Sequence, residues 1–153
     1  LALAYTRKAS PSFFALNKKD SSYFREVLST LGMGLEDRMK TKIGLLSGGQ
    51  RQAASLLMAT IAEPELLLLD EHTAALDPGA AEKVMALTKK IVEENKITTL
   101  MITHDMEYAL EYGSRTIMLD SGKIVMDLTG KEREEMTTGK LAELFYGKAH
   151  KRG

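Results

Sequence analysis

The feature that most constrains the fold is a short apolar run that ends in two carboxylates. Residues 66–69 are four consecutive leucines, and Asp70 and Glu71 follow them directly. Such a run, bounded by polar residues, is typical of a buried strand in a parallel sheet. Ligands bind at the carboxyl ends of strands in open α/β sheets. The sequence therefore predicts an α/β fold with Asp70 and Glu71 placed for chemistry.

A helix and then a second strand follow in the chain, and the second strand also ends in a candidate site residue. Asp77-Pro78 is a natural helix start, because proline is favoured at the first helical position. The helix is predicted to bury one apolar face, formed by Val84, Leu87 and Ile91. Residues 98–103 form the next predicted strand, and His104 follows at its carboxyl end. His104 is thus a third candidate site residue.

The C-terminal part continues with a hairpin and a helix. Residues 115–119 and 123–128 flank Ser121-Gly122, which predicts a tight two-residue turn. A short helix is predicted before it, over residues 106–112. Residues 138–148 are predicted to form an amphipathic helix whose inward-facing positions are Leu141, Leu144 and Phe145.

A Ser-Gly-Gly corner enters another predicted helix. Ser47 is a good N-cap residue, and residues 53–59 have helical character. Gly48 and Gly49 offer backbone N–H groups without side chains at the positive end of the helix dipole, which suits a phosphate. Taken alone, the same stretch also fits a glycine turn before a core helix.

The first third of the chain is predicted to be helix and loop. Residues 1–5 resemble the middle of a helix, and residues 6–20 are polar and basic, as in a connector. Ser21-Ser22 is predicted to cap a helix that Gly32 and Gly34 end. Its apolar positions, at helical spacing, are Tyr23, Phe24, Val27, Leu28 and Leu31. Residues 35–42 are predicted to form a charged turn or short helix.

Composition excludes several classes of function. Acidic and basic residues balance at 21 each, so no global field attracts nucleic acid, and we expect no nucleic-acid partner. The chain has no cysteine, which excludes disulfides. Its apolar runs are far shorter than a bilayer span, and no signal segment opens the chain. We expect a cytoplasmic domain.

Four motifs in order carry a resemblance to a known family. Residues 46–52 resemble a signature motif, residues 66–71 a Walker B motif, residues 75–78 a D-loop and residues 102–105 an H-loop. In this order they resemble the nucleotide-binding subunit of an ABC transporter. The resemblance implies a partial P-loop NTPase (RecA-like) core. Residues 1–60 would form the ABC helical subdomain and residues 61–153 the C-terminal part of the ATPase core.

The resemblance also implies roles for the candidate residues. Asp70 would serve Mg²⁺, directly or through water, and Glu71 would be the general base that polarises the attacking water. His104 would hydrogen-bond the γ-phosphate of ATP. The competing interpretation of Asp70 and Glu71 is a pair of solvated carboxylates at a strand end. The family often has proline where this chain has His72, which we interpret as a loop residue without chemistry.

The signature residues are predicted to act across a dimer. In the family, ATP lies between the P-loop of one subunit and the signature of a second. Ser47, Gly48, Gly49 and Gln50 would therefore contact nucleotide that the second ATPase subunit of a homodimer holds. Asp77, in the D-loop, would lie at the same interface, and its competing role is helix initiation.

One essential motif is absent from the sequence. The P-loop, Gly-x-x-x-x-Gly-Lys-Ser/Thr, does not occur, and every Gly-Lys pair is followed by Ile, Glu, Leu or Ala. The resemblance therefore predicts a truncated portion of a longer subunit. The P-loop, the adenine-stacking aromatic and the Q-loop glutamine would precede Leu1. We expect the parent to be an ATPase and the 153-residue chain to be inactive alone.

The resemblance favours the ATP-hydrolysing subunit of a bacterial import system. Its partners would be transmembrane permease subunits and, indirectly, a solute-binding protein, and it would lie on the inner face of the cell membrane. The motif wording resembles importers of amino acids or related small solutes. Two alternatives are a soluble ABC ATPase of DNA repair or translation, and a non-catalytic module that dimerises through its signature face.

Overall fold

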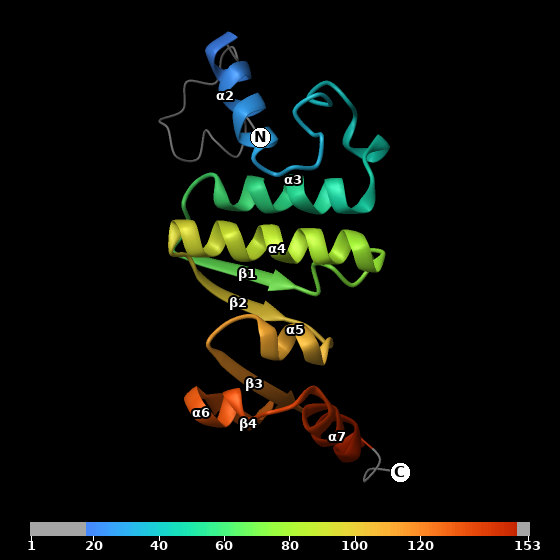
Figure 1. Cartoon of the computed structure of the whole chain (residues 1–153), viewed down its shortest axis with the longest axis vertical. Coiled ribbons are helices and arrows are strands. Elements are labelled where there is room, and N and C mark those ends of the chain that lie inside the picture. Colours follow the sequence, from blue (N-terminus) through green and yellow to red (C-terminus); the bar gives the residue numbers. More distant parts are fainter. Residues whose placement is uncertain (1–17, 150–153) are drawn as a thin grey trace. The chain divides into compact units, whose positions relative to one another are not determined.

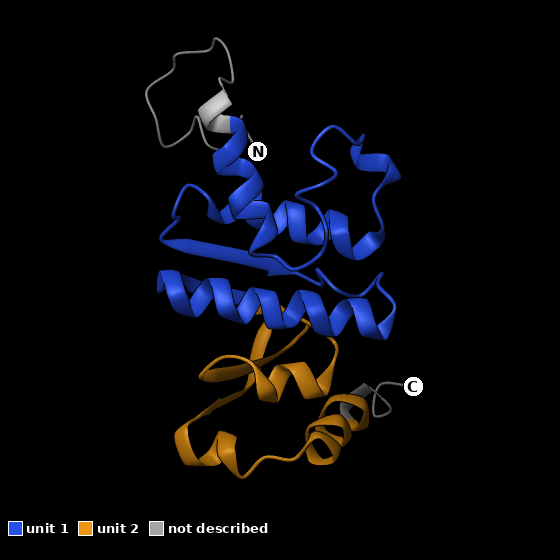
Figure 2. Ribbon diagram, turned by 45° about the horizontal axis from the view of Figure 1, so that its top comes forward, with its two compact units in different colours: residues 1–100 blue, residues 101–153 orange. Residues whose placement is uncertain are grey.

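The computed structural model describes residues 18–149 (Figure 1). The chain divides into two compact units, residues 1–100 and residues 101–153, which are described separately (Figure 2). The helix predicted over residues 1–5, and the connector up to residue 17, lie outside the described residues. The division predicted from the resemblance, 1–60 and 61–153, stays a prediction about subdomains.

The first unit opens with helix α2, Lys18–Ser29. It begins three residues before the predicted cap at Ser21, because Lys18, Lys19 and Asp20 are compatible with a helix and extend it. Phe24 and Leu28 on the helix are buried as predicted, as is Leu31 just after its end, whereas Tyr23 is exposed. Gly32 and Gly34 end the helical stretch with positive φ of 62° and 68°. Turns and a 3₁₀ helix, η1 (Ile43–Leu45), then lead to the Ser47 corner.

Two longer helices, α3 (Gly48–Thr60) and α4 (Pro78–Asn95), pack side by side (Figure 1). Their buried faces are apolar: Ala53, Leu56 and Leu57 on α3, and Val84, Met85, Leu87 and Ile91 on α4. The helices approach closely near their N-termini because the residues there are small. A Cβ added to Gly49 would lie 3.2 Å from the Ala80 Cβ. The predicted buried face of the second helix is confirmed.

Strands β1 (Leu66–Asp70) and β2 (Thr98–Ile102) pair in a two-stranded sheet. Their arrows point the same way in Figure 1, as predicted for a parallel sheet. The sequence predicts a buried strand here, and among the described residues only one face of β1 is buried. Leu67 and Leu69 are buried, but Leu66 and Leu68 are 53% and 65% exposed, because described elements cover only one face of the strand.

The second unit contains helix α5 (Met106–Glu111) and the predicted hairpin, β3 (Arg115–Asp120) and β4 (Lys123–Thr129). Asp120 pairs with Lys123 across the two turn residues, and Ser121 and Gly122 have φ of 49° and 75°. Two positive φ values are the requirement of a type I′ turn, whose twist matches that of the strands. The hairpin prediction is confirmed.

Two helices follow the hairpin, and the sequence predicted only the second. Helix α6, Gly130–Glu134, is short and polar, and it packs against β3 and β4. Helix α7, Thr138–Ala149, contacts α5. Leu141 is buried as predicted. Leu144 and Phe145 were also predicted to face inward, but both are exposed. Within the described residues, no helix is long and apolar enough to cross a membrane.

Candidate nucleotide site

The Ser47 corner is a fully formed capping box at the start of α3. The Ser47 Oγ accepts a hydrogen bond from the Gln50 N–H at 3.2 Å, and the Gln50 Oε1 accepts from the Ser47 N–H at 3.1 Å. The Arg51 Nη1 donates to the Leu46 carbonyl at 2.6 Å, which ties the preceding residue to the helix. The first N–H groups of a helix have no partner within it, and they carry the positive end of its dipole. The geometry of this helix start suits an anion.

Gln50 has a structural role that sequence reasoning missed. Besides its part in the capping box, its Nε2 donates to the Met33 carbonyl at 3.0 Å and so ties α3 to the loop after α2. The Ser-x-x-Gln spacing is itself a capping-box signature, and it was the signal that could have revealed this. A direct contact between Gln50 and nucleotide stays a prediction.

The signature glycines contact the segment that precedes and begins α4. A Cβ added to Gly48 would lie 2.9 Å from the Leu76 Cδ2, a distance that real Cβ atoms essentially never show. Gly49 is buried against Ala80 and the Met33 side chain. Glycine at these positions therefore allows close packing within one chain, in addition to any approach of a phosphate. The structure brings the signature corner together with the D-loop segment that ends in Asp77.

Asp77 is the N-cap of α4, as the helix-initiation hypothesis predicted. Its Oδ1 accepts from the Ala80 N–H at 3.0 Å, and Pro78 occupies the first helical turn. The side chain is exposed, so one carboxylate can cap the helix and still face a second subunit. Its interface role stays a prediction.

Asp70 and Glu71 lie where β1 ends, and both are exposed. Glu71 has φ of 43°, in the left-handed region that non-glycine residues seldom occupy. The Ala74 N–H donates to the Glu71 carbonyl at 3.0 Å, and the Leu76 N–H donates to the Thr73 carbonyl at 3.0 Å. The chain thus turns away from the strand at Glu71. Glu63, Lys96 and Ser121 also have positive φ, after α3, at the end of α4 and in the hairpin turn, so the conformation marks a sharp turn and does not by itself mark a functional site.

His72 is more than a loop residue, because it bonds to the neighbouring helix. It is half-buried, and its Nε2 lies 3.2 Å from the Thr88 Oγ1 on α4. Burial lowers the pKa of His72 below its usual value, which favours the neutral ring. The residue following the predicted base is therefore anchored to α4.

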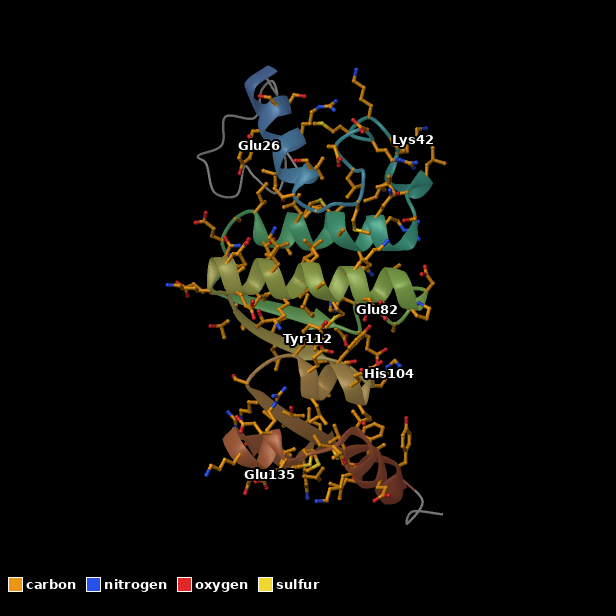
Figure 3. The ribbon with its side chains drawn as sticks, in the orientation of Figure 1. Glu26, Lys42, Glu82, His104, Tyr112 and Glu135 are labelled. Atoms are coloured by element: carbon orange, nitrogen blue, oxygen red, sulfur yellow. The ribbon has the colours of Figure 1, made fainter. Side chains whose placement is uncertain are left out.

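His104, labelled in Figure 3, lies in the turn between β2 and α5 and is exposed. Its neighbours on both sides fix the turn. The Thr103 Oγ1 accepts from the Asp105 N–H at 3.0 Å, and the Asp105 Oδ1 accepts from the Glu107 and Tyr108 N–H groups at 2.9 and 3.0 Å. His104 belongs to the second unit, and its contact with a γ-phosphate stays a prediction.

The donor set suits Mg²⁺ only when phosphate takes part. Among the described residues, no group of three or more His, Asp or Glu side chains could hold a metal ion. Mg²⁺ bound with phosphates typically takes one or two carboxylates and completes its shell with phosphate oxygens and water. An exposed Asp70 at a strand end fits that arrangement.

Comparison with known proteins supports the same family. The ABC transporter family model matches residues 4–74. A tyrosine transport ATP-binding protein of Clostridioides difficile is 49% identical over 119 residues, which cover 78% of this chain and 47% of that protein. A phosphonates import ATP-binding protein of Halalkalibacterium halodurans is 38% identical over 109 residues, covering 71% of this chain and 45% of its own length.

A solved structure agrees with these relatives. A dimeric ATP-binding cassette in a post-hydrolysis state, bound to ADP and phosphate, matches with a TM-score of 0.60 and 31% identity. The match covers 82% of this chain and 56% of that cassette. The chain belongs to the ABC transporter ATP-binding proteins, a family of nucleotide-binding ATPases with a P-loop NTPase fold. Its named relatives above are ATP-binding proteins of transport systems, and it spans about half their length.

Proposed function

We propose that the full-length protein is the ATP-hydrolysing subunit of a bacterial ABC import system. The observation that carries this proposal is the carboxylate pair at the end of β1, with Glu71 held at φ of 43°. The 49% identity to a tyrosine transport ATP-binding protein supports the transport role. The name of that relative specifies tyrosine, so the proposed solute is an amino acid, with tyrosine as the first to test.

The residues of this chain would divide the work at the nucleotide. Asp70 would hold Mg²⁺, which when bound neutralises charge on the phosphates. Glu71 would orient the attacking water and accept its proton. His104 would donate a hydrogen bond to the γ-phosphate. The P-loop that these roles require is not among the 153 residues, so we propose that the parent supplies it and that this chain alone does not turn over ATP.

Ser47, Gly48, Gly49 and Gln50 would act on nucleotide held by a second copy of the subunit. The Ser47 corner at the start of α3 supports this proposal, because the N-terminus of a helix carries the positive end of its dipole and suits a phosphate. Asp77 would lie at the same dimer interface. The dimeric cassette among the structural matches is consistent with this arrangement.

The full subunit would work beside transmembrane permease subunits, on the inner face of the cell membrane, and indirectly with a solute-binding protein. Exposed leucines support the view that further chain covers the sheet in the parent. Leu66 and Leu68 on β1, and Leu100 and Ile102 on β2, leave one apolar face uncovered in the described residues. Strands that are apolar on both faces are typical of sheets covered on both sides. A soluble ABC ATPase of DNA repair or translation is not favoured, since the named relatives act in transport.

The test is ATP turnover by the full-length protein and its Glu71→Gln variant, measured as phosphate release. We expect the variant to lose on the order of a hundredfold in rate, because the amide cannot accept the proton. Binding of ATP should be unchanged. Glu65→Gln is the matched control, because it removes the same charge from an exposed residue just before β1. Normal turnover in Glu71→Gln would remove Glu71 from the mechanism, and no turnover by the full-length protein would overturn the proposal.

A further inference from the structure

The turn after β1 is connected to α4 at two separate places. Near the helix start, the Asp77 carboxylate accepts the Ala80 N–H. Eleven residues beyond Asp77, about three helical turns along α4, the Thr88 hydroxyl lies 3.2 Å from the His72 Nε2. The first connection is a local cap. The second fixes the residue next to Glu71.

The hydrogen bonds of Thr88 determine the direction of the contact with His72. The Thr88 Oγ1 lies 2.8 Å from the Val84 carbonyl, which can only accept, so the single hydroxyl hydrogen is donated there. Towards His72 the hydroxyl oxygen can therefore only accept. The Nε2 of His72 must carry a hydrogen, which assigns the Nε2–H tautomer to the neutral ring.

Burial makes this hydrogen bond consequential. Thr88 is buried, with 5% of its surface exposed, and His72 is half-buried. A polar group that loses its hydrogen-bond partner in such a place destabilises the fold, because water cannot fully replace the partner. The anchored histidine thus opposes movement of the backbone that begins at Glu71.

We infer that His72 is a positioning residue, whose Nε2–H bond to Thr88 holds Glu71 in its left-handed conformation and so aims the carboxylate. This inference rests on the proposed function, in which Glu71 handles the attacking water. Glutamate gains nothing intrinsically from φ of 43°, so the surrounding contacts must maintain it. The bond from the adjacent residue to a buried hydroxyl is such a contact.

The test is a set of variants in the full-length protein, with kcat and KM for ATP measured for each. His72→Ala should lower kcat on the order of tenfold, since small misplacement of a catalytic group is costly. KM should stay within twofold, because the nucleotide is held elsewhere. His72→Gln should recover part of the loss, since its amide can still donate.

Thr88 provides the matched pair on the other side of the bond. Thr88→Val removes the hydroxyl at nearly constant volume and should reproduce the loss in kcat. Thr88→Ser keeps the hydroxyl and should retain most activity. His72→Ala combined with Thr88→Val should be no slower than the worse single variant, because both remove one interaction. Thermal unfolding of each variant identifies any that fail to fold, and the Thr88 pair then decides alone.

A direct readout is the ¹⁵N spectrum of labelled histidine in the full-length protein, where His72 should have a protonated Nε2. Normal kcat in His72→Ala and in Thr88→Val would overturn the inference, as would losses that multiply in the double variant. Glu71→Gln separates this result from the proposed function. If that variant is inactive while His72→Ala turns over normally, only the positioning role fails. If Glu71→Gln turns over ATP normally, the proposed role of Glu71 fails first, and if the unchanged full-length protein does not hydrolyse ATP, the proposed function fails.

Discussion

Two loops leave the carboxyl ends of the paired strands β1 and β2, and they are held in different ways. The loop after β1 runs from Glu71 to the cap of α4 at Asp77, and His72 anchors it to Thr88, sixteen residues along the chain. The loop after β2 is short. Its hydrogen bonds join Thr103 to Asp105, and Asp105 to the first turn of α5.

The two loops differ in which contacts hold the backbone of their candidate site residues, Glu71 and His104. Glu71 has a positive φ of 43°, and the next residue, His72, lies within hydrogen-bond distance of the buried Thr88, which in our inference maintains that conformation. His104 lies between a threonine and an aspartate that organise its turn locally. We therefore expect the position of the Glu71 carboxylate, the proposed general base, to depend on tertiary structure, whereas the hydrogen bonds of the histidine turn lie within its own sequence.

The largest expected effect separates strain from chemistry at Glu71. Glu71→Gly in the full-length protein should lose ATP turnover on the order of a hundredfold, as Glu71→Gln should. The two variants should differ in stability. Glycine accepts φ of 43° without steric cost. The free energy of unfolding of Glu71→Gly should therefore exceed that of Glu71→Gln by about 1 kcal/mol, which also raises its unfolding temperature.

Phosphate release measures the loss of turnover in both variants, and thermal unfolding measures the difference in their stability. The comparison of the two loops would be broken if glycine destabilised the protein more than glutamine does. The backbone at Glu71 would then be unstrained, and no distant anchor would be needed to hold it.

The second prediction asks whether helix α5, which follows the His104 turn, is also held only by local bonds. Arg133 on α6 donates to the Thr116 Oγ1 at 3.0 Å and to the carbonyls of Leu110 and Tyr112, which end α5. Arg133→Met should cost about 1–3 kcal/mol, because partly buried acceptors lose their donor. Hydrogen exchange of the α5 and β3 amides measures it in the full-length protein.

Lys131→Met is the control, since Lys131 is exposed on the same helix. Faster exchange confined to Arg133→Met would show that the helix after His104 also needs a distant contact. The comparison would then apply to the His104 turn alone and not to α5. Equal exchange in both variants would contradict the prediction.

Most of the local structure could be predicted from the sequence, and the reasons are physical. Helix starts at Ser47 and Asp77 and the turn at Ser121-Gly122 follow from side chains that bond their own backbone or tolerate positive φ. The exposed leucines of β1 could not be predicted, because composition tells which faces are apolar but not what covers them. The His72–Thr88 bond was also missed, because the two residues are sixteen positions apart and only the packing of the turn against α4 brings them together.

The third prediction compares the two helix caps directly. Asp105→Ala removes an acceptor shared by two N–H groups and should cost about 1 kcal/mol. Asp105→Asn should restore most of that, because asparagine is also a good cap. Asp77→Ala removes one acceptor and should cost a similar or smaller amount. Denaturant unfolding of the full-length variants gives the differences, and a neutral Asp105→Ala would show that the turn before α5 is not held by its cap.

The smallest expected effect tests whether distance along the chain or burial makes an anchor important. Arg115 and Asp127 are twelve residues apart on β3 and β4, and they form two hydrogen bonds of 2.8 and 2.6 Å. Both side chains are exposed, so water and salt weaken the pair, unlike the buried contact at Thr88. Asp127→Asn should therefore change the unfolding temperature only slightly.

The pH dependence of this pair has a definite sign. Hydrogen bonds from Arg115, assisted by its charge, lower the pKa of Asp127 below its usual value in the folded protein. The folded state then favours the carboxylate, so the stabilisation is complete above about pH 4, the ordinary range of an aspartate, and is lost as the pH falls through the lowered pKa. The small difference between wild type and Asp127→Asn should be constant near neutral pH and vanish in acid. A large difference at neutral pH would mean that an exposed bond can anchor the chain as well as a buried one, and sequence separation alone would then explain the contrast between the two loops.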